Sequence, residues 1–248
     1  MRKLNLLSMA LMGMMLTSIS TVSADSLEPV KGRFGFGYTE SSGNTDETKM
    51  NFGLNLTQKR TEQLKFGYDA LALYGKSEGQ KNADKKQFKF SSEFIKSEKF
   101  SWYANIGYMK DEFAGYEDQY TLGLGMINYF IKGEETVFSC SLGLDFTKEK
   151  YTDNTKDDQA WMRFGLDGKR KVAENVRFAG HFGFVAPKDD TDEAYRTETV
   201  AGLIFTINPK LDAEMKYIVD YNKAPVDAKE KYDRTFITSV AYKIWLLY

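Results

Sequence analysis

The sequence is poor in cysteine, histidine and proline. Its 248 residues include one cysteine, one histidine and four prolines. The single cysteine, Cys140, cannot form an internal disulfide, and no metal cluster can be built around it. Few prolines suit long, uninterrupted strands, because proline removes a donor from a hydrogen-bonded sheet. We therefore expect extended β-structure with no cofactor and no metal.

A long apolar run is absent beyond the N-terminus, where nothing approaches the roughly 18 apolar residues of a membrane helix. The first residues have the pattern of a secretory signal peptide. Arg2 and Lys3 are basic, residues 6–16 are apolar, and Val22-Ser23-Ala24 is a small-residue cleavage site. We expect residues 1–24 to be removed, which leaves residues 25–248 as one domain. A short N-terminal helix that stays attached is the alternative.

An excess of one charge sign is also absent. The formal net charge is −1, which argues against a nucleic-acid partner. The mean hydropathy is negative. That value is compatible with a membrane β-barrel, in which only every second strand residue meets lipid. Aromatic residues make up 15% of the chain, enough to supply girdles at the membrane interfaces.

What the sequence does contain is alternation with a period of two. In residues 50–57, Met, Phe, Leu and Leu alternate with Asn, Gly, Asn and Thr. Residues 240–248 are apolar at every second position down to a terminal tyrosine. This period is typical of strands with one apolar face, and no helical period competes with it.

The alternation predicts twelve strands. Their expected spans are 31–40, 49–58, 63–75, 86–96, 99–110, 119–131, 135–147, 159–169, 174–186, 196–207, 210–221 and 233–248. Because hydrocarbon offers backbone amides no partner, a membrane sheet must close on itself. We therefore predict an all-β fold, a transmembrane antiparallel β-barrel. A soluble β-sandwich is the alternative, but it leaves the aromatic final strand unexplained.

The gaps between the strands give the barrel a direction. Tight connections are expected at 59–62, 97–98, 132–134, 171–173 and 209, and longer polar loops at 41–47, 76–85, 111–118, 148–158, 187–195 and 222–232. In bacterial barrels short turns face the periplasm and long loops face outward. An even number of strands then places both termini in the periplasm.

The face opposite the apolar one carries glycine and charge of both signs. The expected lumen-lining charges are Arg33, Lys65, Asp69, Lys89, Glu93, Asp145, Arg163, Asp167, Arg177, Asp212, Glu214, Lys216 and Asp220. Glycine on this face would let long charged side chains from the opposite wall cross the lumen. The charges can pair and close the lumen or leave a narrow aqueous path, and their mixed signs argue against strong ion selectivity.

Three other features have simple explanations. His181 points into the lumen by parity, but no serine is placed beside it as a nucleophile would need. The acidic runs at 189–193 and 153–158 lack the glycine-bearing order of a calcium loop and are expected to be solvated. The cluster at 41–46 is a turn, since Asn and Asp bond their own backbone.

The final strand also resembles the signal read by the outer-membrane barrel assembly machinery. The expected signal residues are Tyr242, Ile244, Leu246 and Tyr248. We expect that machinery, outer-membrane lipid and lipopolysaccharide as partners.

Three short motifs, in order, resemble a known family. They are Ser42-Gly43-Asn44-Thr45, the run from Asp111 to Tyr116 followed by Leu122-Gly123-Leu124-Gly125, and Lys231-Tyr232-Asp233-Arg234 before the closing strand. Together they resemble the YdiY-like, salt-induced outer-membrane proteins, a β-barrel family grouped under a domain of unknown function. The resemblance implies an outer-membrane location and an osmotic role, and it brings no catalytic residues.

Three functions remain open from the sequence. The first is a narrow, porin-like passive channel linked to salt or osmotic stress. The second is a closed barrel that stabilises the envelope. The third is an outer-membrane hydrolase that uses His181. We expect no enzymatic activity, and the solute and the oligomeric state are not encoded in any motif.

Overall fold

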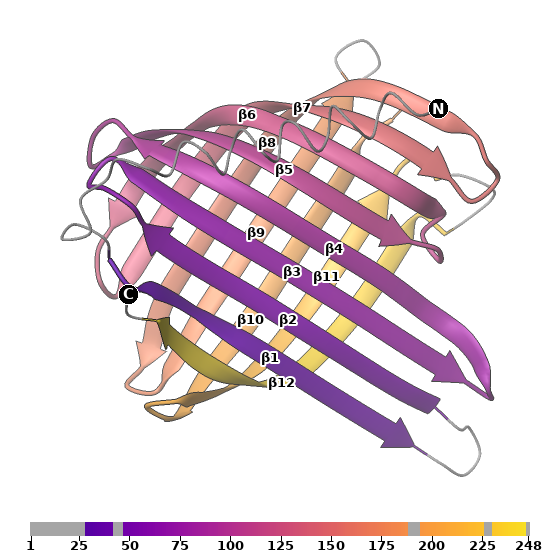
Figure 1. Cartoon of the computed structure of the whole chain (residues 1–248), viewed down its shortest axis with the longest axis horizontal. Helices are drawn as coiled ribbons and strands as arrows, with labels where there is room; N and C mark the ends of the chain where they lie inside the picture. Colours follow the sequence, from indigo (N-terminus) through magenta and orange to yellow (C-terminus); the bar gives the residue numbers. More distant parts are fainter. Residues whose placement is uncertain (1–27, 42–46, 188–193, 226–229, 247–248) are drawn as a thin grey trace.

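The computed structural model describes residues 28–41, 47–187, 194–225 and 230–246, and it forms one closed antiparallel barrel (Figure 1). Each strand pairs with its neighbours in sequence, and β1 pairs with β12 to close the ring. The strands are β1 Val30–Ser41, β2 Glu47–Lys59, β3 Leu64–Ser77, β4 Gln80–Ile95, β5 Phe100–Asp111, β6 Tyr116–Lys132, β7 Thr136–Tyr151, β8 Lys156–Ala173, β9 Val176–Pro187, β10 Arg196–Asn208, β11 Leu211–Asn222 and β12 Tyr232–Leu246. The predicted fold class and number of strands are confirmed.

The outer wall is apolar because the register aligns large apolar side chains around the ring. Leu54 on β2 lies opposite Phe34 on β1 and Ala70 on β3, and Leu124 on β6 lies opposite Ala104 and Leu144. Side chains such as Leu124 remain about half exposed, as expected for a surface that meets lipid. In the described residues there is no helix with the length and apolar character needed to cross a membrane.

The two ends of the barrel differ in their connections. At one end, which we call the turn end, β2–β3, β4–β5, β6–β7, β8–β9 and β10–β11 are joined. The turn between β10 and β11 is held by the side chain of Asn208, whose Oδ1 accepts hydrogen bonds from the backbone amides of Lys210 (2.8 Å) and Leu211 (2.9 Å). At the other end, the loop end, the remaining pairs of consecutive strands are joined.

Some of the connections differ from the prediction. The expected loop at 76–85 is mostly strand, and β3 and β4 meet at a two-residue turn in which Glu78 (φ 51°) and Gly79 (φ 75°) are both left-handed. Such a pair matches the twist of a tight hairpin. Strands also extend into the expected loops at 111–118 and 148–158, and β8 covers the expected turn at 171–173. These strand ends are polar, so they lack the apolar alternation on which the prediction relied.

Candidate functional site: the lumen

The register places all thirteen predicted lumen charges on the inner face. Asn55, Asp69 and Lys89, for example, are consecutive partners across β2, β3 and β4, one position away from the apolar row of Leu54. Asn55 donates a short hydrogen bond to Asp69. The remaining charges lie on the inner face of β1, β3, β4, β7, β8, β9 and β11, and their role in conducting a solute stays a prediction.

Glycine on the inner face makes room for side chains that lie one or two strands away, which differs from the expected contacts with the opposite wall. A Cβ at Gly143 would lie 2.3 Å from the Tyr103 hydroxyl and 2.6 Å from the carbonyl oxygen of Leu124. A Cβ at Gly123 would meet Asp145 and Asn105 at 2.6–2.7 Å. Side chains such as Tyr103 and Asn105 therefore lie along the wall, over glycine one or two strands away.

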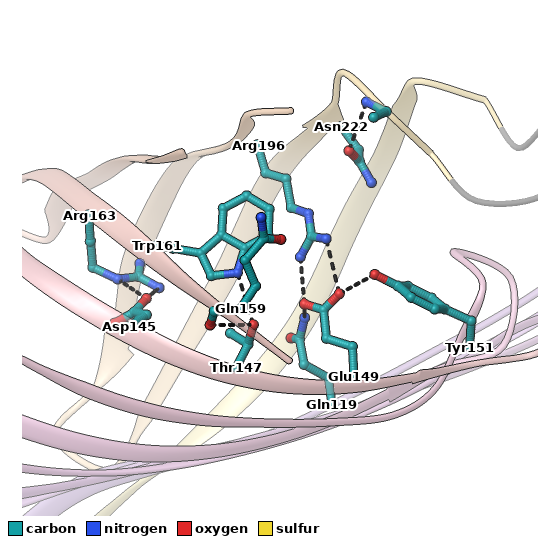
Figure 2. Close-up of polar contacts among 11 residues, drawn as sticks. Gln119, Asp145, Thr147, Glu149, Tyr151, Gln159, Trp161, Arg163, Arg196 and Asn222 are labelled. Carbon is teal, nitrogen blue, oxygen red and sulfur yellow. Dashed lines mark hydrogen bonds and ion pairs between the residues drawn. The ribbon is translucent and has the colours of Figure 1, made fainter. Parts of the chain in front are cut away.

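A cluster of polar side chains surrounds Arg196 near the loop end (Figure 2). Arg196 on β10 bonds both carboxylate oxygens of Glu149 on β7, at 2.7 and 3.0 Å. Gln119 donates to Glu149 at 2.6 Å, and Tyr151 makes a short hydrogen bond to it. Glu149 is 1% exposed, so its charge is compensated almost entirely by these neighbours.

Aromatic side chains hold the Arg196 guanidinium from the other side. It lies 4.3 Å from the ring centroid of Trp161 and 5.5 Å from that of Tyr116. The Trp161 ring is in turn fixed by its Nε1, which donates to the Thr147 hydroxyl at 2.9 Å. Stacking on a fixed ring orients the planar cation toward Glu149. The cluster therefore joins β6, β7, β8 and β10 across part of the interior.

A second contact crosses the interior near the loop end. Lys85 on β4 reaches Asp220 on β11 at 3.3 Å and Asp111 on β5 at 3.6 Å. β4 and β11 are not neighbours in the ring. Asp220 itself lies in a row of carboxylates, because the strand register places it opposite Glu198 on β10 and Asp233 on β12. The loop end of the interior is therefore rich in acidic side chains.

In the middle of the barrel, Arg163 pairs closely with Asp145 on the adjacent strand. His181 Nδ1 lies 2.9 Å from Asp167, and Nε2 lies 3.7 Å from Glu198. No serine hydroxyl is hydrogen-bonded to His181 within the described part of the chain. The imidazole is thus held between two carboxylates. In the hydrolase alternative His181 would be the base, and it has no serine nucleophile in contact with it among the described residues.

Near the turn end, basic side chains cover buried carboxylates. Asp212 on β11 pairs with Lys243 (2.8 Å) and Arg177 (3.5 Å). Glu214 pairs with Arg33 (2.6 Å) and Lys216 (3.1 Å). On the other wall, Glu93 accepts a hydrogen bond from Tyr129 (2.7 Å) and pairs with Lys65 (3.4 Å).

A cavity of about 550 Å³ occupies the middle and the loop end of the interior. Its lining includes Lys89, His181 and Arg163 in the middle and Lys85, Arg196 and Asp220 near the loop end. Residues of the connections themselves also contribute, among them Phe113 and Pro225. The open space thus extends from the middle of the barrel to its loop end.

Polar groups outside this cavity have local roles. Asp153 Oδ1 accepts hydrogen bonds from the amide (2.8 Å) and hydroxyl (2.6 Å) of Thr155, and these bonds lower the pKa of Asp153. That part of the acidic run at 153–158 is therefore a turn. The run at 189–193 and most of the cluster at 41–46 lie outside the described residues. No group of acidic, histidine and cysteine side chains suited to a metal ion occurs in the described residues.

The predicted assembly signal is described in part. Tyr242 and Ile244 lie on the outer face of β12, opposite Phe34 and Gly32 of β1. Leu246 is the last residue of β12, and Tyr248 lies outside the described residues. The outer position of Tyr242 and Ile244 keeps both side chains available to lipid or to an assembly factor.

Several interior residues were missed by the sequence analysis. Glu149 and Lys85 fall in segments predicted to be loops, and Arg196, Glu198 and Lys243 lie at positions not included among the lumen charges. The parity of the strands would have identified the last three, since Arg196 and Glu198 alternate with outward Thr197, and Lys243 with Tyr242. No comparable signal marked Glu149 and Lys85, because the polar strand ends do not alternate with apolar residues.

The fold defines a structural class, the closed antiparallel β-barrels, which also occur in outer-membrane channels. The porin NanC superposes with a TM-score of 0.50 at 9% identity, covering 88% of this chain and 100% of the porin. An outer-membrane channel from Pseudomonas putida F1 gives a TM-score of 0.50 at 11% identity, covering 89% and 96%. At such low identity these likenesses show the fold alone.

The sequence comparisons identify a family within this fold class. The chain belongs to the family described as "Protein of unknown function, DUF481", which matches residues 34–244. The "Uncharacterized protein YdiY" of Escherichia coli (strain K12) is 23% identical over 228 residues, covering 89% of this chain and 86% of that protein. The resemblance to YdiY-like proteins inferred from the short motifs is therefore confirmed.

Proposed function

We propose that this protein is a narrow passive channel for small polar solutes in the bacterial outer membrane. The observation that carries the proposal is the cavity inside a closed barrel, lined by charged side chains such as Lys89, Arg163 and Asp220. An aqueous path through lipid needs an apolar outer wall and a polar interior, and the barrel has both. The porin and channel folds of its structural relatives agree with this function.

The orientation and the location belong to the same proposal. We place the turn end and both termini in the periplasm and the loop end outside, because bacterial barrels have short periplasmic turns and longer extracellular loops. The mature chain would then begin at Asp25, after the signal peptide. Outer-membrane lipid, lipopolysaccharide and the barrel assembly machinery are its proposed partners. N-terminal sequencing of protein from an outer-membrane fraction tests both points, and a chain that starts at Met1 or stays in the soluble periplasm contradicts them.

The link to salt or osmotic stress comes from the family resemblance alone. The link can be tested by comparing the level of this protein in cells grown with and without added salt. Once conductance is known, solute uptake by the same cells can be compared as well. A protein level that does not respond to salt contradicts the link and leaves the channel proposal intact.

Single-channel recording of refolded protein in planar bilayers is the direct experiment. We expect small, steady conductance steps, because Lys85 and Arg196 cross the interior and leave only part of it open. Heat-modifiable migration on gels confirms that the same sample is folded. A folded barrel without conductance would favour the closed, envelope-stabilising barrel, which the transverse ion pairs at the loop end also fit.

A further inference from the structure

Basic side chains gather at one end of the interior. Arg33 lies near the start of β1, Lys65 near the start of β3, Arg177 near the start of β9 and Lys169 near the end of β8. All four positions are close to the turn end, and all four face inward. We call these four residues the basic ring.

The carboxylates at this end are buried beneath the cations. The Asp212 side chain is 0% exposed, whereas Arg177, with which it pairs, is 51% exposed. Lys65 is 42% exposed and its partner Glu93 only 12%. A solute beside these pairs therefore meets the guanidinium and ammonium groups before the carboxylates. The predicted lumen charges are nearly balanced, with six basic and seven acidic residues, and this balance predicts weak selectivity from sequence. It does not describe the surface that a solute contacts at this end.

Cations of the basic ring face the interior from different parts of the wall. Desolvation disfavours the charge of Lys169 most, the positive charges of Lys65 and Arg33 disfavour it further, and weaker attractions to Asp167 and Asp69 offset this in part. β8 is separated from both β1 and β3 by several strands in either direction around the ring. Among the described residues no carboxylate lies within ion-pair distance of Lys169. Close like charges are unfavourable, and a bound or passing anion would relieve the repulsion.

The basic ring lies beyond the cavity. None of its four residues lines the open space, which reaches from the loop end to the middle of the barrel. Their long side chains extend into the interior from several strands, on the turn-end side of that space. In a channel, the charges that line the path govern which ions pass. A solute that crosses from the cavity to the turn end passes the basic ring, so the ring is placed to select.

We propose that the basic ring is an anion filter, so that the protein passes small anions, such as chloride, phosphate or short carboxylates, in preference to cations. This inference rests on the proposed channel function and names its substrate class. Arg33, Lys65, Lys169 and Arg177 are the residues that determine specificity. The acidic row of Glu198, Asp220 and Asp233 lies at the opposite end, where these side chains line the cavity and Lys85 partly compensates Asp220.

Reversal potentials in a potassium chloride gradient test the proposal. We expect the wild-type potential to have the sign of a chloride-selective pore. Lys169→Glu and Lys65→Glu should move it toward zero or reverse it, with Lys169→Gln intermediate. Lys148→Gln is the matched control, because it also removes one positive charge but lies on the outer face, paired with Asp158. Its potential should equal that of the wild type. Gel migration verifies that every variant is folded.

Inorganic phosphate gives a second readout of the same site. Added phosphate should reduce the chloride current of the wild type, and Lys169→Gln should weaken this block while Lys148→Gln does not. Conductance with equal permeabilities or a preference for cations overturns the filter and leaves the channel function standing. Selectivity that is unchanged in both glutamate variants overturns the assignment to the basic ring. A folded wild-type barrel without any conductance overturns the channel function and the filter together.

Discussion

Arg196 on β10 and Glu149 on β7 form a two-point ion pair although two strands separate them around the ring (Figure 2). The pair draws β7 and β10 together through the interior, which backbone pairing alone does not do. Glu149 is buried, and its remaining contacts come from Gln119 and Tyr151. Removing one partner would leave a buried charge whose compensation is incomplete.

Arg196→Met should therefore lower the free energy of unfolding by about 3–5 kcal/mol, the usual cost of breaking a buried ion pair from one side. Urea unfolding of refolded protein in lipid vesicles, followed by tryptophan fluorescence, measures this. Adding Glu149→Gln to Arg196→Met should recover part of the loss, because the unpaired charge is removed. Lys148→Gln, which breaks an exposed pair, should cost less than about 1 kcal/mol. A double variant as unstable as the sum of its singles would contradict the coupling.

The two faces of β2 and β3 should respond differently to polar substitution. Leu54→Arg and Phe66→Arg both place a charge against lipid. The cost should be about 2–4 kcal/mol for Leu54→Arg near the middle of the membrane, and smaller for Phe66→Arg, which lies closer to the turn end. Asn55→Arg should cost less, since the new guanidinium can pair with Asp69. Gly67→Ser should also be mild, because the nearest atom to its Cβ is the Ser91 hydroxyl, which can rotate. Unfolding in vesicles compares all four, and equal losses on both faces would refute the assignment of inside and outside.

Glycine on the inner face offers a sharper comparison. Gly143→Ala should lower stability by about 1–3 kcal/mol, the cost of overpacking, because its Cβ would meet Tyr103 and a backbone carbonyl. Gly53→Ala should be neutral or slightly stabilising, by up to about 1 kcal/mol, since nothing lies within 4 Å of its Cβ. Both are inward glycines in strands, so each controls for the other. A Gly143→Ala barrel as stable as wild type would show that Tyr103 does not depend on this glycine.

The sequence alone predicts most of the fold, because the lipid imposes a period of two wherever a strand crosses it. Leu54 and Asn55 are assigned to opposite faces by that rule, and the structure agrees. The rule fails at the loop end, where β4 extends through Lys85 without apolar neighbours. There both faces of a strand are polar, so strand and loop have the same composition.

The partners within the lumen could not be predicted for a different reason. Lys85 contacts Asp220, and Arg196 contacts Glu149, only because the strands tilt and the ring closes with a particular stagger. Sequence gives the face on which a side chain lies but neither its height in the barrel nor the residue opposite. Sequence also does not show which inward side chains are buried. Asp212 and Arg177 are both predicted lumen charges, although only Arg177 is exposed to the lumen.

Closure of the ring depends on the last strand. β12 pairs with β1 from Val30↔Leu246 to Phe36↔Val240, the only register that completes the barrel in the described residues. Deleting residues 246–248 should block assembly in cells more than it lowers stability, because an unpaired edge is not tolerated in lipid and the proposed assembly signal is lost. Heat-modifiable migration of membrane fractions measures assembly, and urea unfolding of refolded protein measures stability. Ile244→Ser, which keeps the backbone pairing but removes an outward apolar side chain, separates the signal from the closure. Truncated protein that inserts at wild-type levels would show that this strand carries neither role.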